Sequence, residues 1–384
     1  MPMSRPAFLV LLAACGAIAA SRVANAEPLD LARVPAAAVW LMHADMDAAR
    51  DSTVVRRMYE RVVRKHPEVE NMMGMAAGLS GMDPRKDLHD VTVYGLDTEK
   101  KNAVMIVHAD ANRAFLEKMV EKARDHETMK HRGYVLHAWT HKGWKGHKGD
   151  KVVAAFFKDD LMVFARTAGQ VERALDVLEG EAPAAGRESP LAGRTRPGSI
   201  LVARASKVDP DTKCPVLRQG EGFRVAMGEN DGDSFYRARL DMESDAAAEL
   251  AEDVAEGLAA TVALGLGKEK GVMKVFEGLE TTTRGKTCLI AWNARADDVW
   301  EMTEALADKI EVKIEARIAA KKKAGCGCDE CRCATCDGQT CEQGGCKDCG
   351  SKCGSACESG KCPLEQGSAA RESEARRPFE DDEF

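Results

Sequence analysis

Hydrophobic residues in the first third of the chain alternate between the spacing of a strand and that of a helix. Residues 39–43 form a short apolar run that predicts a strand. Asp45 or Asp47 can cap a helix after it, in which apolar side chains recur every three or four residues: Val54, Val55, Met58, Val62 and Val63. Pro67 is typical of the first position of a further helix. Two strands, near residues 90–96 and 103–108, and a helix over 110–124 are predicted next.

One short phrase occurs twice in this region, His43-Ala44-Asp45 and His108-Ala109-Asp110, each time at the predicted end of a strand. The repetition indicates a duplicated unit of strand, cap and helix. Two interpretations stay open. The two histidines form a metal-binding pair, or each aspartate caps a helix while the histidine packs beside it.

The remaining apolar pattern predicts strands at 134–141, 152–157 and 161–165 and a helix at 170–178. Three prolines, Pro183, Pro190 and Pro197, then lie among small residues and indicate a boundary. We therefore expect a first domain over residues 27–180 and a linker over 181–198.

A second domain is expected over residues 199–324. Strands are predicted at 199–205, 223–227 and 234–242, with an acidic turn at 228–233 between the last two. Ser244 and Asp245 can cap an alanine-rich helix that ends near residue 264, and strands follow at 273–282 and 287–292. A long helix is predicted by apolar residues three or four apart: Val299, Met302, Leu306, Ile310, Ile314 and Ile318.

This order of elements predicts an α+β fold of two tandem sandwiches. In each, helices pack on a mostly antiparallel sheet, in a ferredoxin-like manner. The arrangement is similar to that of exported bacterial proteins built from tandem α+β repeats, a resemblance that implies no activity. No apolar segment after the first 26 residues is long enough to span a membrane.

The N-terminal residues predict export. Arg5 precedes an apolar run over residues 7–20, and Ala24-Asn25-Ala26 supplies the small residues that a signal peptidase needs, so residues 1–26 are expected to be removed. The alternative is a lipoprotein anchored at Cys15. Either way, we expect a periplasmic or secreted protein.

The net charge and the absence of known catalytic motifs limit the classes of function that we expect. The net charge is −7, and removal of Arg5 and Arg22 makes the chain two charges more negative, so a nucleic-acid partner is not expected. The chain has no G-x-S-x-G, H-E-x-x-H, phosphate-loop or dinucleotide motif, so we expect no enzyme.

The one strong chemical pattern is a cysteine-rich segment over residues 325–363, after which residues 364–384 form a polar, acidic end that we expect to be disordered. Eleven cysteines lie within it and no histidine, aromatic or large aliphatic residue interrupts them. They are Cys326, Cys328, Cys331, Cys333, Cys336, Cys341, Cys346, Cys349, Cys353, Cys357 and Cys362. A segment without an apolar core needs metals or disulfides to hold a shape. Thiolates suit Zn²⁺ in sets of four, and soft sulfur also suits Cu(I) and Cd.

The opening of this segment, Cys326-Gly-Cys328-Asp-Glu-Cys331-Arg-Cys333, resembles the C-x-C-x-x-C-x-C start of bacterial metallothioneins. The resemblance covers about a tenth of the chain and implies that Cys326, Cys328, Cys331 and Cys333 are metal ligands. The later spacing differs from that family, and histidine ligands are missing from the segment.

We therefore expect an exported, non-enzymatic protein whose cysteine-rich segment sequesters soft metal ions, with zinc first and Cu(I) or Cd as the alternatives. The alternative is a protein that binds a cell-envelope partner and whose segment is closed by disulfides. An odd number of cysteines leaves one thiol unpaired in a purely intramolecular disulfide scheme.

Overall fold

The computed structural model describes residues 29–99, 102–141, 150–266 and 272–324. The chain divides into two compact units, residues 1–305 and residues 306–384. The description below concerns the first, and only the bounds of α9 extend into the second. The predicted signal peptide, the cysteine-rich segment and the acidic end all lie outside the described residues.

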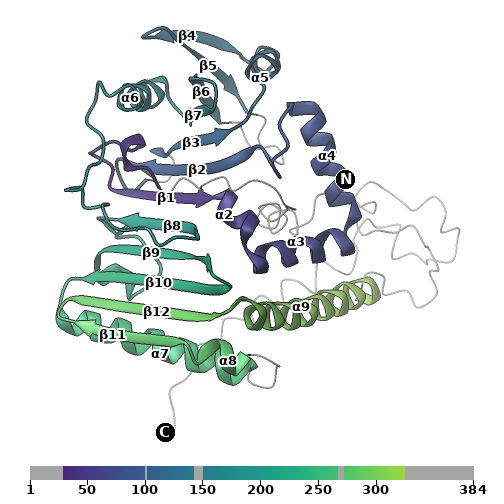
Figure 1. Cartoon of the computed structure of the whole chain (residues 1–384), viewed down its shortest axis with the longest axis vertical. Coiled ribbons are helices and arrows are strands. Elements are labelled where there is room, and N and C mark those ends of the chain that lie inside the picture. Colours follow the sequence, from purple (N-terminus) through teal and green to yellow (C-terminus); the bar gives the residue numbers. More distant parts are fainter. Residues whose placement is uncertain (1–28, 100–101, 142–149, 267–271, 325–384) are drawn as a thin grey trace, which may run out of the picture. The chain divides into compact units, whose positions relative to one another are not determined.

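Within the described ranges, twelve strands form one sheet (Figure 1), in the order β11-β12-β10-β9-β8-β1-β2-β3-β7-β6-β5-β4, and every neighbouring pair is antiparallel. The strands are β1 (Trp40–Asp45), β2 (Leu88–Gly95), β3 (Val104–Ala109), β4 (Glu127–His131), β5 (Tyr134–Thr140), β6 (Lys151–Phe157), β7 (Leu161–Ala165), β8 (Ser199–Ala205), β9 (Gly220–Asn230), β10 (Asp233–Met242), β11 (Leu279–Arg284) and β12 (Thr287–Arg295).

The helices are η1 (Leu31–Arg33), α2 (Met46–Asp51), α3 (Thr53–Lys65), α4 (Pro67–Ser80), α5 (Arg113–Val120), α6 (Ala168–Leu178), η4 (Leu217–Gln219), α7 (Asp245–Leu266), α8 (Val272–Phe276) and α9 (Ala296–Ala324). The α+β class, with helices packed on a mostly antiparallel sheet, is confirmed.

The two halves that we expected as separate sandwiches share this sheet. β1, the first strand, pairs with β8, the first strand after the expected linker, so that Trp40 lies opposite Ala205 and Leu41 opposite Arg204. The expected linker, residues 181–198, packs against the protein and contributes the buried side chains of Ala185 and Leu191. Backbone hydrogen bonds from Ala185 to Val34 and from Ala36 to Pro183 hold it beside the start of the fold.

Helices cover opposite faces of the sheet in its two halves. Side chains directly opposite each other on paired strands project to the same face, and successive residues alternate. Leu41, Arg204, Arg224, Arg239 and Leu289 thus share one face, which we call the Leu41 face. Since Cys288 neighbours Leu289, it projects to the other side, the Cys288 face.

In the first half, α6 covers the Leu41 face. Its Val171, Ala174 and Leu175 are buried in one core with Leu41 and Ile106, together with side chains from β5, β6 and β7. In the second half, the helix is on the Cys288 face. Ala247, Ala248 and Ala251 of α7 pack with Met242 and Cys288 in a smaller core. The Leu41 face of the second half is therefore not covered by α7.

Three predicted elements differ from the structure. The one helix expected after Asp45 is two helices, because Ser52 ends α2 and its side chain caps α3. Residues 273–282 were expected to form one strand, but α8 occupies the start of this range and β11 begins only at Leu279. Val272 and Val275 are both buried, at the three-residue spacing of a helix face. The helix expected over 110–124 is the shorter α5, because Asn112 rather than Asp110 accepts the capping hydrogen bond, from the backbone of Phe115.

Candidate functional site

All eleven predicted metal ligands lie in the cysteine-rich segment, outside the described residues. The zinc, copper and cadmium predictions attached to them therefore stay predictions. Within the described residues, Cys214 is exposed and Cys288 is buried, and both are free thiols. Burial, followed by the charge of Glu252, raises the pKa of the Cys288 thiol, so this side chain stays protonated in the core.

His43 and His108 belong to neighbouring parts of one polar cluster on the Leu41 face, but they have different partners. Nδ1 of His43 lies 2.9 Å from the hydroxyl of Thr92, which is directly opposite it in the β1–β2 pair. Nδ1 of His108 lies 3.0 Å from Oδ2 of Asp90, which is opposite it in the β2–β3 pair. The part of the chain that the structure describes contains no group of three or more side chains arranged to hold a metal ion.

The expected helix cap is present in only one copy of the repeated phrase. The carboxylate of Asp45 accepts a hydrogen bond of 2.8 Å from the backbone of Ala48 and caps α2. Asp110, its counterpart, instead lies 3.4 Å from Nε2 of His89 in an ion pair. The repetition in sequence therefore corresponds to two strand ends with different capping chemistry.

Asp90 is the centre of this polar cluster. Its carboxylate is buried, with His108 at 3.0 Å and Arg33 at 3.4 Å from Oδ2. The hydrogen bond to Asp90 raises the pKa of His108, whereas burial lowers the pKa of His43. The pKa of Asp45 is raised to about 6, mainly by burial. The raised pKa values of Asp45 and His108 favour their protonated forms in the folded protein. His43 and Thr92 are both buried, so a substrate could not reach them.

A second histidine pair was not found from the sequence. His126 lies before β4, and its Nε2 is 3.1 Å from Nδ1 of His137 on β5, with the two rings stacked. Burial and the neighbouring His126 lower the pKa of His137. The pair depends on the β4–β5 hairpin, and β4 was not predicted because its sequence contains few apolar residues.

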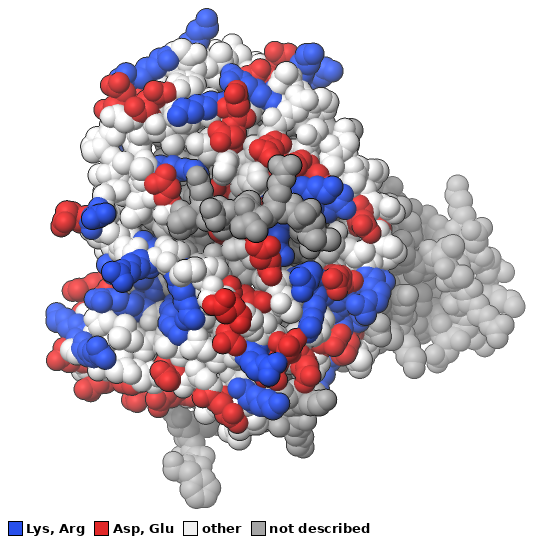
Figure 2. Space-filling view, viewed as in Figure 1, with Lys and Arg blue, Asp and Glu red and all other residues white. Residues whose placement is uncertain are grey.

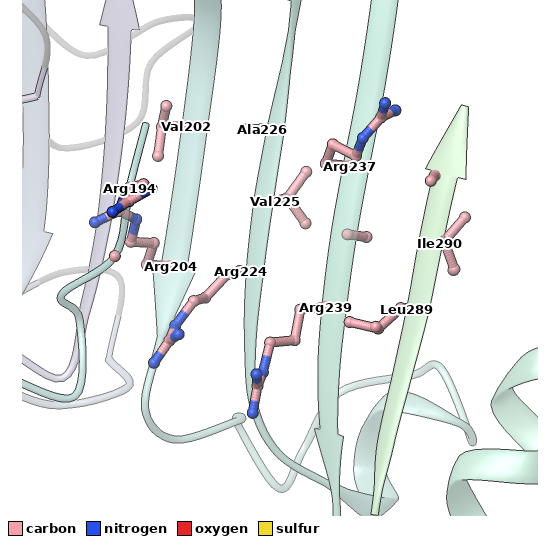
Figure 3. A pocket seen from close by; sticks show the side chains of 13 residues that line it. Arg194, Val202, Arg204, Arg224, Val225, Ala226, Arg237, Arg239, Leu289 and Ile290 are labelled. Carbon is pink, nitrogen blue, oxygen red and sulfur yellow. The ribbon is translucent and has the colours of Figure 1, made fainter. Parts of the chain in front are cut away.

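A groove with a volume of about 350 Å³ lies on the Leu41 face of the second half (Figure 3). Its lining comes from β8, β9, β10 and β12 and from the segment before β8. Five of the lining residues are arginines: Arg194, Arg204, Arg224, Arg237 and Arg239. Figure 2 shows a group of lysine and arginine side chains over β8 and β9.

This groove was not predicted from the sequence. The arginines come from four separate segments, and in the sequence each of them resembles an ordinary surface residue. Arg237 and Arg239 alternate along one strand, which is the only local signal of a charged sheet face. The strand register brings the others beside them.

Comparison with known proteins gives no family. No protein-family model matches the chain, and no curated protein matches it. Among solved structures, crystal form III of TP0453 is similar, at 8% identity and a TM-score of 0.39, covering 73% of this chain and 100% of that one. Crystal form IV of TP0453 also has 8% identity and a TM-score of 0.39, with 74% and 99% of the chains covered.

No helix within the described ranges combines the length and the apolar character that crossing a bilayer requires.

Proposed function

We propose that this chain is an exported metal-binding protein whose cysteine-rich segment sequesters soft metal ions, zinc first, in thiolate clusters. The observation that carries the proposal is the density and spacing of the eleven cysteines between Cys326 and Cys362. Two cysteines in a C-x-C arrangement can serve one ion or bridge two neighbouring ions. A disulfide between residues so close in sequence is strained.

The folded part has a separate role in this proposal. Its described residues contain no group of three or more side chains that could hold a metal ion, and α9 ends at Ala324, two residues before the first cysteine of the segment. The sheet and its helices then locate the metal-binding segment, and metal binding does not require them.

The alternative function is an interaction protein of the cell envelope, with a segment closed by disulfides. Export into an oxidising compartment favours this alternative, because thiols there form disulfides unless a metal protects them. The two functions differ in the chemical state of the cysteines, and that state can be measured directly.

The test is to isolate the full-length mature protein from its own compartment, without reductant or chelator, and to count metal ions and free thiols. Sharing of sulfurs between four-coordinate ions leads us to expect about three or four zinc ions per chain. Treatment with a chelator should then expose the thiols of the segment. Protein that contains no metal and almost no reactive thiol besides Cys214 would instead support the disulfide-closed alternative.

A further inference from the structure

Three arginines lie directly opposite one another on adjacent strands of the Leu41 face. Arg204 of β8 is opposite Arg224 of β9, and Arg224 is opposite Arg239 of β10. Directly opposite side chains have their Cβ atoms about 5 Å apart, and like charges in these positions destabilise a sheet. In Figure 3 the side chains of Arg224 and Arg239 run in the same direction along the strands, whereas that of Arg204 turns toward Arg194 on the preceding segment.

Most of the hydrogen-bond partners of these guanidinium groups are neutral. Arg204 is only 4% exposed, and it donates to the carbonyl of Leu191 and the hydroxyl of Thr195, each at 2.9 Å. Arg224 donates to the carbonyl of Pro190 at 3.2 Å. Among the described residues, the groove's arginines form one ion pair, between Arg239 and Asp241 at 2.8 Å.

These contacts do not explain why the residues are arginines. A neutral glutamine could donate to the same carbonyl and hydroxyl groups without like-charge repulsion in the row. A charged group in the interior is costly unless an opposite charge accompanies it. Burial and the neighbouring Arg224 lower the pKa of Arg204, because both disfavour its charged form. An anion bound between the arginines would offset it.

The rest of the groove is apolar apart from Arg237, whose guanidinium donates to the carbonyls of Tyr236 and Trp292 and to the side-chain oxygen of Asn293. The next register row along the strands carries Val202, Ala226, Arg237 and Ala291, and Leu289 continues the arginine row on β12. Ala226 and Ala291 are small and leave room beside Leu289. A volume of about 350 Å³ is at the lower end of the range for small-molecule sites. The groove therefore combines a cationic end with an apolar floor.

We propose that this groove binds a small organic phosphate, with its phosphate group between Arg194, Arg204 and Arg224 and its apolar body over Ala226, Leu289 and Ala291. A phosphate monoester carries a charge of about −1.5 to −2 near neutral pH and matches the planar fork of arginine. Three arginines without a carboxylate partner in the described structure favour such a dianion over a monocarboxylate. The site is independent of the cysteine-rich segment and of the proposed metal binding.

The experiment is isothermal titration calorimetry on the full-length mature protein with phenyl phosphate, inorganic phosphate and benzoate. We expect one phenyl phosphate per chain, bound at least tenfold more tightly than either of the other two. Its affinity should fall as NaCl is raised, because salt screens the arginines. No binding of phenyl phosphate at millimolar concentration would overturn the proposal. If benzoate binds as tightly as phenyl phosphate, the proposed preference for a dianion is wrong. If inorganic phosphate binds as tightly, the proposed contact between the ligand's apolar body and the apolar floor is wrong.

Variants locate the site. Arg224→Gln should weaken phenyl phosphate binding about tenfold or more, since it removes a charge-assisted contact. Arg284→Gln is the matched control, because Arg284 is an exposed arginine at the end of β11 and does not line the groove. If circular dichroism shows that Arg224→Gln is unfolded, Arg194→Gln replaces it, because Arg194 is exposed and lies outside the strands. Equal effects of the groove and control variants, or no effect of the folded groove variant, would overturn the proposal.

Discussion

The hydroxyl of Ser52 donates a hydrogen bond of 2.8 Å to the carboxylate of Glu229, a residue 177 positions further along the chain. Ser52 also caps α3, and the same carboxylate accepts hydrogen bonds from the backbone of Thr53 at 2.9 Å and of Val54 at 3.2 Å. Glu229, near the end of β9, thus satisfies backbone N–H groups that the first turn of any helix leaves without a partner. The negative charge also lies at the positive end of the helix dipole.

Replacement of this carboxylate should destabilise the fold. We expect Glu229→Gln to lower the free energy of unfolding by about 1–2 kcal/mol, because an amide keeps the shape but loses the charge and one acceptor oxygen. Urea denaturation of both proteins at neutral pH measures the difference. Glu221→Gln is the control, since Glu221 is exposed on the same strand. A loss of equal size in both variants would contradict a specific role for Glu229.

The Ser52–Glu229 contact also shows where sequence analysis stops. Local patterns located many elements well: β7 and β8 have the predicted limits, because each is a short apolar run between turn residues. Contacts between distant strands depend on register, and neither the pairing of β1 with β8 nor the row of Arg204, Arg224 and Arg239 is a property of a local pattern.

Elements at the edges of the sheet were harder to predict from the sequence for a different reason. β4 is an edge strand whose side chains are mostly exposed, so it lacks the apolar alternation by which a strand is recognised. The start of the strand expected at residue 273 is helical, and Val272 and Val275 are buried on the same face of this helix. A helix of five residues is too short for its apolar pattern to distinguish it from a strand. The arginine groove was therefore missed because it depends on strand register, and the His126–His137 pair because it depends on β4. The cysteine-rich segment, in contrast, was evident from composition alone.

The buried carboxyl of Asp45 should make stability depend on pH. Burial is the main reason that its pKa is raised from 3.8 to about 6, against the opposing hydrogen bond from Ala48. The folded state then binds more protons than the unfolded state between about pH 4 and pH 6. Stability therefore falls as pH rises through this window, by up to about 3 kcal/mol from this one group.

Asp45→Asn should remove that dependence while keeping the cap on α2, because an asparagine oxygen can accept the same hydrogen bond. Urea denaturation between pH 4 and pH 7 should show the wild type losing stability relative to this variant as pH rises. Asp51→Asn, at an exposed position in the same helix, should leave the wild-type slope unchanged. Parallel curves for the wild type and Asp45→Asn would contradict a raised pKa at Asp45.

His108 should act in a different pH range. Its pKa is raised above 6.5 by the hydrogen bond to Asp90, so its protonated form stabilises the folded state. That contribution is complete below the unfolded pKa and disappears as the pH rises through the folded pKa. We expect the stability difference between the wild type and His108→Asn to be largest near pH 6 and to shrink toward pH 8, as measured by urea denaturation. A difference that grows with pH would show that His108 is neutral in the fold.

Replacement of both Cys326 and Cys328 by serine should reduce the number of zinc ions that the reduced full-length chain binds. The pair either serves one ion or bridges two, so its loss should remove about one ion from the expected three or four, counted by native mass spectrometry under anaerobic conditions. Lowering the pH should release zinc from both proteins, since protons compete with the metal for the thiolate sulfurs. Cys214→Ser is the matched control, because Cys214 is an exposed thiol outside the cysteine-rich segment, and it should leave the count unchanged. If Cys214→Ser lowers the count as much as the double replacement does, zinc binds to scattered thiols and the cluster at residues 326–362 is wrong.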